Sequence, residues 1–151
     1  MFIDGRQVED GSIIETDLAI IGAGAAGIAI ARELAGTDVS VALIESGGFE
    51  FDAATQDLYE GEMGGVDYPL TSSRLRYFGG TTNHWGGWTR PFEPIDFEER
   101  DWVPYSGWPM TRADLDPYYD RAREICQIRS AGFDDASEWA DGGAPLPLAA
   151  E

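Results

Sequence analysis

The sequence predicts an α/β fold built on a parallel sheet, and three segments near the N-terminus carry this prediction. Two almost continuously apolar runs, Leu18–Ile21 and Val39–Ile44, are typical of parallel strands that are covered on both faces. Between them lies a stretch of small residues, Ala25–Ala35, whose apolar positions recur at helical spacing. Strand, helix and strand follow one another within residues 17–45. We therefore expect a βαβ unit that belongs to a Rossmann-like domain.

A glycine triplet joins the first strand to the helix. Gly22 permits a tight turn, Gly24 lets the backbone approach a pyrophosphate, and Gly27 lets the helix lie close to the strand. The free N–H groups at the start of the helix, around Ala25 and Ala26, favour negatively charged phosphates. A G-x-G-x-x-G pattern between a strand and a helix predicts a dinucleotide site.

An acidic residue, Glu45, ends the second strand 18 residues after Gly27. An acid at roughly this distance accepts hydrogen bonds from an adenosine ribose in dinucleotide-binding proteins. Two other interpretations stay open. The glycines form an ordinary turn between strand and helix, or Glu45 merely ends a strand and faces solvent.

The composition is strongly acidic. The chain has 28 acidic residues, 10 arginines and no lysine, with a net charge of −18. This charge argues against nucleic acid and anionic membrane surfaces as partners, because both would repel the protein. Genome composition and adaptation to high salt both remain open as its cause. The N-terminus carries no secretory signal, and the run Leu18–Ala31 is too short to span a bilayer, so we expect a cytoplasmic protein.

The rest of the chain divides by composition. Two Asp-Gly pairs predict a short hairpin arm over residues 1–16. Residues 46–110 are rich in glycine, proline and aromatic residues and show no long strand or helix. Twelve of the 18 aromatic residues fall between Tyr68 and Tyr119, which argues against disorder. We expect this irregular segment to wrap a cofactor or another part of the protein.

A second helix is predicted over residues 111–129. Thr111 and Asp114 form a partial capping box at its start, and Pro117 either kinks the helix or begins a new one. The single cysteine, Cys126, excludes an internal disulfide and offers no metal pair, and its helical spacing predicts a thiol in the helix core. Residues 130–151 are polar and predict a flexible end.

The densest polar motif after the βαβ unit lies within residues 74–87. Its glycine pair and the threonines that follow form a backbone able to run close to a flat or anionic ligand, with further donors beyond them. These residues are Gly79, Gly80, Thr81, Thr82, Asn83 and His84. His84 is the only histidine in the chain.

These motifs resemble the glucose–methanol–choline (GMC) flavin oxidoreductases, above all the branch that contains pyranose oxidase and fructose dehydrogenase-like enzymes. Ile20–Gly27 resembles the family's adenine-dinucleotide fingerprint, and Glu45–Gly48 resembles its acid followed by two glycines. Gly79–Trp85 resembles the segment that passes along the FAD pyrophosphate and reaches the flavin ring. Ser106–Pro109, with the tyrosines that follow, resembles the entry into the substrate region. The likeness covers most of the chain.

The resemblance implies an FAD enzyme that oxidises a CH–OH group of a sugar or alcohol by hydride transfer to the flavin. It places the base in a late histidine pair or histidine–asparagine pair, which this sequence does not contain before Glu151. We therefore expect an N-terminal fragment that is inactive alone and is completed by further polypeptide. The family branch carries flavin covalently on a histidine in a Thr-His-Trp setting. Asn83 replaces that threonine here, so covalent attachment through His84 stays open.

The predicted site contains cofactor-binding residues only, with no catalytic or metal-ligating residue assigned. They are Gly22, Gly24, Ala25, Ala26, Gly27, Glu45, Ser46, Arg76, Gly79, Gly80, Thr81, Thr82, Asn83, His84 and Trp85. Three alternatives remain. They are a flavoprotein of the amine oxidase or monooxygenase type, an NAD-binding protein, and a non-enzymatic carbohydrate-binding module. The substrate and the electron acceptor are left open by the sequence.

Overall fold

The computed structural model describes residues 1–87 and 89–128. They belong to two compact units that divide between Gly86 and Gly87, inside the irregular segment predicted from the sequence. The predicted flexible end at 130–151 lies outside the described residues. The first unit contains the βαβ elements, β1 (Leu18–Ile21), α1 (Ala25–Leu34) and β2 (Val41–Ile44).

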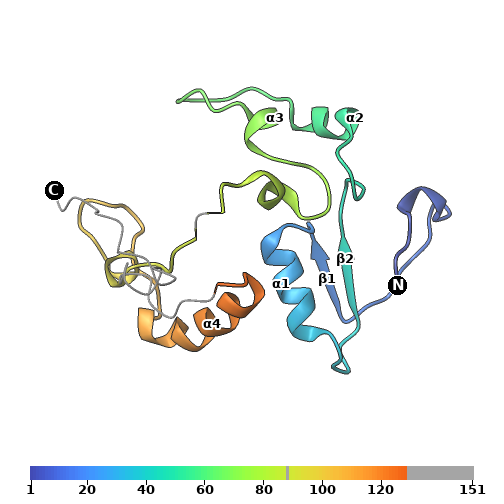
Figure 1. The fold of residues 1–151 in the computed structure, drawn as a ribbon. Coiled ribbons are helices and arrows are strands. Elements are labelled where there is room, and N and C mark those ends of the chain that lie inside the picture. Colours follow the sequence, from blue (N-terminus) through green and yellow to red (C-terminus); the bar gives the residue numbers. More distant parts are fainter. Residues whose placement is uncertain (88, 129–151) are drawn as a thin grey trace, which may run out of the picture. The chain divides into compact units, whose positions relative to one another are not determined.

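The two strands of the first unit pair in parallel, and α1 packs on one face of the sheet (Figure 1). Their register runs from Leu18 opposite Val41 to Ile21 opposite Ile44. This arrangement confirms the predicted α/β class. The second strand begins two residues later than predicted, because Ser40 is engaged with Asp17. The Asp17 carboxylate accepts hydrogen bonds from both the N–H and the hydroxyl of Ser40.

The core of the first unit lies where the strand meets the helix. Ala23 is fully buried and Ile20 is 9% exposed. A Cβ built on Gly27 would lie 2.0 Å from the carbonyl oxygen of Gly22, so only a glycine permits this approach of helix to turn. In the described part of the chain the other face of the sheet is left open, since Ile21 is 88% exposed and Ile44 is 51% exposed.

The N-terminal arm differs from its prediction. Residues 1–16 contain no strand but a short 3-10 helix, η1 (Gly5–Gln7). The Asp4 carboxylate accepts hydrogen bonds from the backbone N–H and the guanidinium of Arg6. The hairpin prediction is therefore wrong, because local side-chain capping of the first Asp-Gly pair closes a helical turn instead.

The rest of the first unit is a chain of short elements, as the irregular composition predicted. In order they are α2 (Ala53–Gln56), η2 (Asp57–Tyr59), α3 (Leu70–Ser73) and η3 (Gly80–His84). Asp52 caps α2, because its carboxylate accepts the N–H of Thr55 at 2.7 Å. None of these elements exceeds five residues, so side-chain hydrogen bonds must hold the segment in shape.

Gln56 provides the central hydrogen bonds of this segment. Its side chain is 5% exposed, and its amide nitrogen donates to the carbonyls of Thr71 and Arg74, each at 2.6 Å. Its amide oxygen accepts the N–H of Arg76 at 3.0 Å. One buried amide thus ties the end of α2 to the backbone that leads into η3.

The second unit is organised around Phe97 and a long helix. Its elements are η4 (Pro94–Phe97) and α4 (Arg112–Ile125). Phe97 is 8% exposed and its ring meets that of Phe92. Two side chains of α4 bind the two backbone polar groups of Phe92. The Phe92 N–H donates to the Tyr119 hydroxyl, and the Arg112 guanidinium donates to the Phe92 carbonyl.

The start of α4 follows the prediction, whereas the position of Cys126 differs from it. Thr111 and Asp114 form a complete capping box, and the helix continues through Pro117 without a new start. The predicted core position of Cys126 is wrong, because the thiol is exposed at the C-cap and no residue of α4 is buried. On the predicted face of the helix, Leu115 and Tyr119 are half-buried and the Tyr119 hydroxyl accepts the Phe92 N–H, whereas Cys126 is exposed.

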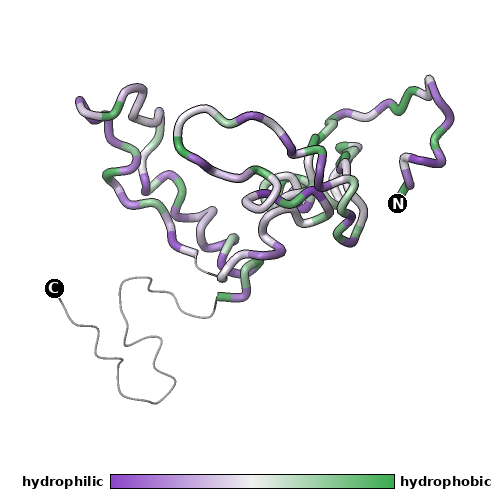
Figure 2. The backbone as a smooth tube through the Cα atoms, turned by 90° about the horizontal axis from the view of Figure 1, so that it is seen from above, coloured by the Kyte–Doolittle hydropathy of each residue, from purple (hydrophilic) through white to green (hydrophobic). Residues whose placement is uncertain are grey.

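Hydrophobic residues are scattered along the described chain. Figure 2 shows hydrophobic and hydrophilic stretches alternating along the tube. Within residues 1–87 and 89–128, no helix has the length and apolar character needed to cross a membrane.

We expect Gln56→Ala to loosen the segment that leads into η3. The substitution leaves two carbonyls and one N–H without their partner, at a cost of about 1–3 kcal/mol in the free energy of unfolding. Urea denaturation measures this loss, and hydrogen exchange at the Arg76 amide locates it. Gln7→Ala, at an exposed glutamine, is the matched control. Unchanged protection of the Arg76 amide in Gln56→Ala would contradict the assignment.

Candidate functional site

The glycine turn between β1 and α1 leaves the start of the helix free of side chains. Gly22 has a φ of +100°, which favours glycine, and its N–H donates to the Ile44 carbonyl at 2.7 Å. Gly24 is the N-cap of α1 and supplies no side-chain cap. The first N–H groups of the helix, at Ala25 and Ala26, therefore face a position that a negatively charged group can occupy.

Glu45 closes the turn from the end of β2. Its Oε2 accepts the Ala23 N–H at 2.8 Å, and its Oε1 accepts the N–H groups of Ser46 at 2.9 Å and Gly47 at 3.1 Å. The Ser46 hydroxyl also donates to Oε1. Burial raises the pKa of the Glu45 carboxyl, but the hydrogen bonds from Gly47, Ala23 and Ser46 outweigh it and hold the pKa below its usual range.

The predicted ribose acceptor therefore already binds backbone groups of this chain. A carboxylate oxygen has two lone pairs. Oε1 of Glu45 accepts three hydrogen bonds, whereas Oε2 accepts one. Oε2 is the atom of Glu45 that retains capacity to accept a bond from a ligand.

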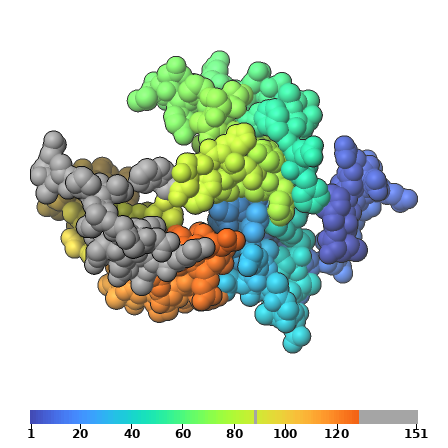
Figure 3. All heavy atoms as spheres, in the orientation of Figure 1, coloured from blue at the N-terminus to red at the C-terminus, as the bar shows by residue number. Residues whose placement is uncertain are grey.

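The glycine-rich segment docks directly on the turn. The Gly79 N–H donates to the Ala23 carbonyl at 2.7 Å, and Gly79 forms an isolated parallel bridge with Gly24. A Cβ on Gly80 would lie 3.2 Å from the Gly24 Cα, and the φ of Gly80 is +59°. Figure 3 shows the atoms of η3, in yellow-green, lying against the blue atoms of α1. The two predicted motifs thus form one structural site.

An open hollow of about 460 Å³ lies where the two motifs meet. Its lining comes from the end of β1, the turn, the first turns of α1 and the threonines of η3. The lining residues are Ile20, Ile21, Gly22, Gly24, Ala25, Ala26, Gly27, Ile30, Thr81 and Thr82. Seven of these were predicted from the sequence as cofactor-binding residues. The hollow combines backbone donors with apolar side chains, which suits a phosphate joined to a flat ring.

Asn83, His84 and Trp85 do not line the hollow, whereas Thr82 lines it and also shapes the segment. The Asn83 amide donates to the Phe78 carbonyl at 2.8 Å, and the Thr82 hydroxyl donates to the Gly79 carbonyl. His84 lies 3.2 Å from the Tyr77 hydroxyl through Nε2. Trp85, which follows η3, is 50% exposed.

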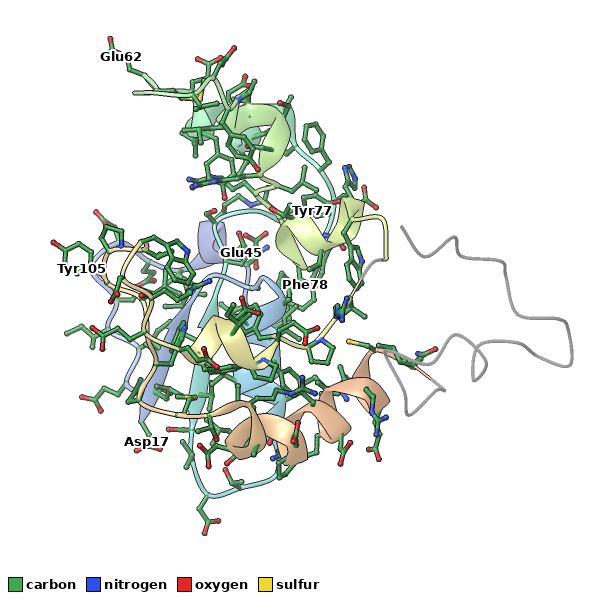
Figure 4. All side chains as sticks on the ribbon, turned by 90° about the vertical axis from the view of Figure 1, so that its left-hand side faces the viewer. Asp17, Glu45, Glu62, Tyr77, Phe78 and Tyr105 are labelled. Carbon is green, nitrogen blue, oxygen red and sulfur yellow. The ribbon has the colours of Figure 1, made fainter. Side chains whose placement is uncertain are left out.

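Arg76 and Ser46 join the end of β2 to the glycine-rich segment. The Arg76 guanidinium donates to the Ser46 hydroxyl at 3.2 Å and lies over the Tyr59 ring at 4.3 Å from its centre. Its Nε is buried without a hydrogen-bond partner among the described residues. A Cβ on Gly47 would lie 2.1 Å from the Arg76 carbonyl oxygen, so a glycine is required there. Figure 4 shows Glu45, Tyr77 and Phe78 gathered around this junction.

Three contributors to the site are absent from the predicted set of cofactor-binding residues, although Gly47 belongs to the Glu45–Gly48 motif noted in the sequence. Gln56 orients the segment, Gly47 allows its backbone to approach, and Ile30 lines the hollow. Ile30 lies one helical turn beyond Gly27, and this spacing could have identified it. Gln56 carries no such signal, because its three partners lie 15 to 20 residues away in sequence. In residues 1–87 and 89–128, no cluster of three or more His, Cys, Asp or Glu side chains could hold a metal ion.

We expect Glu45→Gln to remove an acid-sensitive part of the stability. The folded pKa of Glu45 is lowered, so its contribution is fully present above the unfolded pKa of about 4.3 and is lost as pH falls through the folded pKa. The stability gap between the wild-type chain and Glu45→Gln should therefore narrow towards low pH in urea titrations. Glu50→Gln controls for the loss of one surface charge. A gap that stays constant with pH would contradict this role of the carboxylate.

The comparison with protein families agrees with this geometry. A family model described as FAD dependent oxidoreductase matches residues 17–145. That stretch begins just before β1 and includes the glycine turn, Glu45 and the glycine-rich segment. No curated protein and no solved structure matches the chain. Because the match covers most of the sequence, the chain belongs to the FAD dependent oxidoreductase family.

Proposed function

We propose that this chain forms the FAD-binding part of a GMC-type oxidoreductase that oxidises CH–OH groups of sugars or alcohols. The observation that carries the proposal is the docking of Gly79 on the glycine turn, through its hydrogen bond to Ala23 and its bridge to Gly24. This contact joins the dinucleotide fingerprint to the segment whose sequence resembles the flavin-contacting stretch of GMC enzymes. A turn that bound only the adenosine half of a nucleotide would not need the second motif.

The residues of the turn fit the FAD pyrophosphate. Gly22 and Gly24 carry no side chain that would fill the space before α1, and a Cβ at either position would meet no atom within 4 Å. The helix has no side-chain cap at its start. The free N–H groups and the partial positive charge of the helix end are therefore available to phosphate oxygens. The threonines of η3 border the same hollow.

Glu45 would hold the adenosine ribose through the free capacity of Oε2. Its lowered pKa keeps it ionised at neutral pH, and a bond from a ribose hydroxyl to a carboxylate is charge-assisted. The bond from the Ala23 N–H sets the position of Oε2 relative to the turn. Ser46 and Arg76 support Glu45 from the other side.

In this proposal the end of η3 serves the flavin half of the cofactor. Thr81 and Thr82 border the phosphate hollow, and His84 and Trp85 follow them along the chain. His84 would lie against the isoalloxazine ring. FAD, when bound, supplies the hydride acceptor, and these residues of the chain hold and orient it.

The substrate class rests on the resemblance of Gly79–Trp85 to GMC enzymes. Membership of the FAD dependent oxidoreductase family is equally compatible with oxidation of amines. The Gly-Gly-Thr-Thr-Asn-His-Trp order favours the CH–OH class, because it is more specific than the dinucleotide fingerprint alone.

We expect Glu45→Ala to weaken FAD binding by at least about tenfold, because one or more charge-assisted bonds of about 1.5–3 kcal/mol are lost. Titration of flavin fluorescence with the chain measures the dissociation constant. Glu50→Ala, which removes an exposed acid outside the site, is the matched control. Equal FAD affinity in Glu45→Ala and the wild-type chain would refute the ribose role.

The substrate class is tested by an oxidation assay with an artificial electron acceptor. The enzyme is purified from its natural source, so that every residue of the native protein is present. We expect turnover with sugars or alcohols and none above background with amines and amino acids. Turnover with amines alone would reject the GMC assignment while leaving FAD binding intact.

A further inference from the structure

Tyr77 contacts the only histidine of the chain. Its hydroxyl oxygen lies 3.2 Å from His84 Nε2, and the two rings meet edge to face with their centres 6.3 Å apart. Figure 4 shows Tyr77 beside η3, the element that carries His84. A side-chain hydrogen bond therefore links Tyr77, two residues before Gly79, to the last residue of η3.

The position of Tyr77 is fixed independently of His84. The Gly80 N–H donates to the Tyr77 carbonyl at 2.7 Å, and Gly47 packs so closely that a Cβ there would lie 2.7 Å from the Tyr77 Cα. The Tyr77 ring also meets the Phe51 ring at 90°. Tyr77 is half-buried and fixed by these contacts, whereas His84 is exposed. The orientation of the His84 imidazole therefore depends on Tyr77, and not the reverse.

The chemistry of the two groups decides the direction of the hydrogen bond. A neutral imidazole has one N–H donor and one acceptor nitrogen, and the partner of one nitrogen sets the state of the other. A phenol O–H is a stronger acid than a neutral imidazole N–H, and an imidazole nitrogen is a stronger base than a phenol oxygen. The stronger bond therefore has Tyr77 donating to Nε2, with the proton of the neutral ring on Nδ1.

We propose that Tyr77 is a positioning residue that holds neutral His84 in its Nδ1–H form, so that His84 meets a ligand as a hydrogen-bond donor through Nδ1. Nε2 is then occupied by the phenol. Thr82 and Asn83 do not compete for the imidazole, because their side chains donate to the carbonyls of Gly79 and Phe78.

This state has a consequence for the flavin, which rests on the proposed function. A covalent bond to FAD needs an imidazole nitrogen with a free in-plane lone pair. In the proposed state Nδ1 carries a proton and the lone pair of Nε2 accepts from Tyr77. This state would disfavour alkylation of either nitrogen, so we expect FAD to be held without a covalent bond and His84 to serve it as a donor.

The single histidine makes the protonation state directly measurable. Nitrogen NMR of the ¹⁵N-histidine-labelled chain, recorded in the alkaline range where the imidazole signals no longer change with pH, reports which nitrogen carries the proton. We expect mainly Nδ1–H in the wild-type chain. In Tyr77→Phe, which keeps the ring and its contact with Phe51, the ratio should shift towards Nε2–H by about fivefold.

Tyr68→Phe is the matched control, because it removes another tyrosine hydroxyl and should leave the ratio unchanged. A wild-type ring that is protonated mainly on Nε2 would overturn the proposal without any variant. So would a ratio that does not change in Tyr77→Phe. The protonation ratio is measured on the chain without FAD, both in the wild type and in Tyr77→Phe. The result is therefore valid whether or not the proposed function is correct.

Acid denaturation after FAD loading tests the consequence for the flavin. We expect the yellow flavin to be found in the supernatant and the precipitated protein to be colourless. A yellow pellet would overturn the non-covalent state. If the fluorescence titration showed no FAD binding at all, the proposed function would fail, and the NMR result would still decide the role of Tyr77.

Discussion

The hydrogen bond from the Gly79 N–H to the Ala23 carbonyl is the contact on which the rest of the first unit depends. It joins two segments that lie far apart in the sequence and places a second glycine-rich backbone against the first. On the side of the glycine-rich segment this approach depends on glycine, because Gly79 and Gly80 both have positive φ and leave little room for a Cβ. A Cβ on Gly80 would crowd Gly24, and one on Gly47 would collide with the Arg76 backbone. Glycine content is therefore a packing requirement here, in addition to a conformational one.

Glu45 adds an electrostatic constraint to this packing. Its carboxylate collects N–H groups from the turn and from the residues after β2, so a single negative charge organises both sides of the site. Such bonds compensate the cost of partial burial and hold the group ionised. In a protein with a net charge of −18, this acid is distinguished from the other acids by its convergent backbone donors and not by its charge.

Sequence reasoning succeeded where local pattern decides structure. The bounds of β1 match the apolar run because no polar residue competes there, and the capping box of α4 is a contact between near neighbours. It failed at the start of β2, where Ser40 bonds to Asp17, and in the N-terminal arm, where Asp4 caps a helical turn. The docking of η3 and the role of Gln56 depend on partners distant in sequence, which spacing alone does not reveal.

The open face of the two-stranded sheet has a consequence for the behaviour of the chain in solution. Ile21 and Ile44 lie opposite each other in the ladder and both are exposed on that face. Strands with apolar side chains and unpaired edges favour association between molecules. Mutual repulsion of highly acidic chains opposes it, and added salt weakens that repulsion. Colloidal stability of this chain should therefore fall as ionic strength rises, which makes dilute buffer the condition that keeps it dispersed.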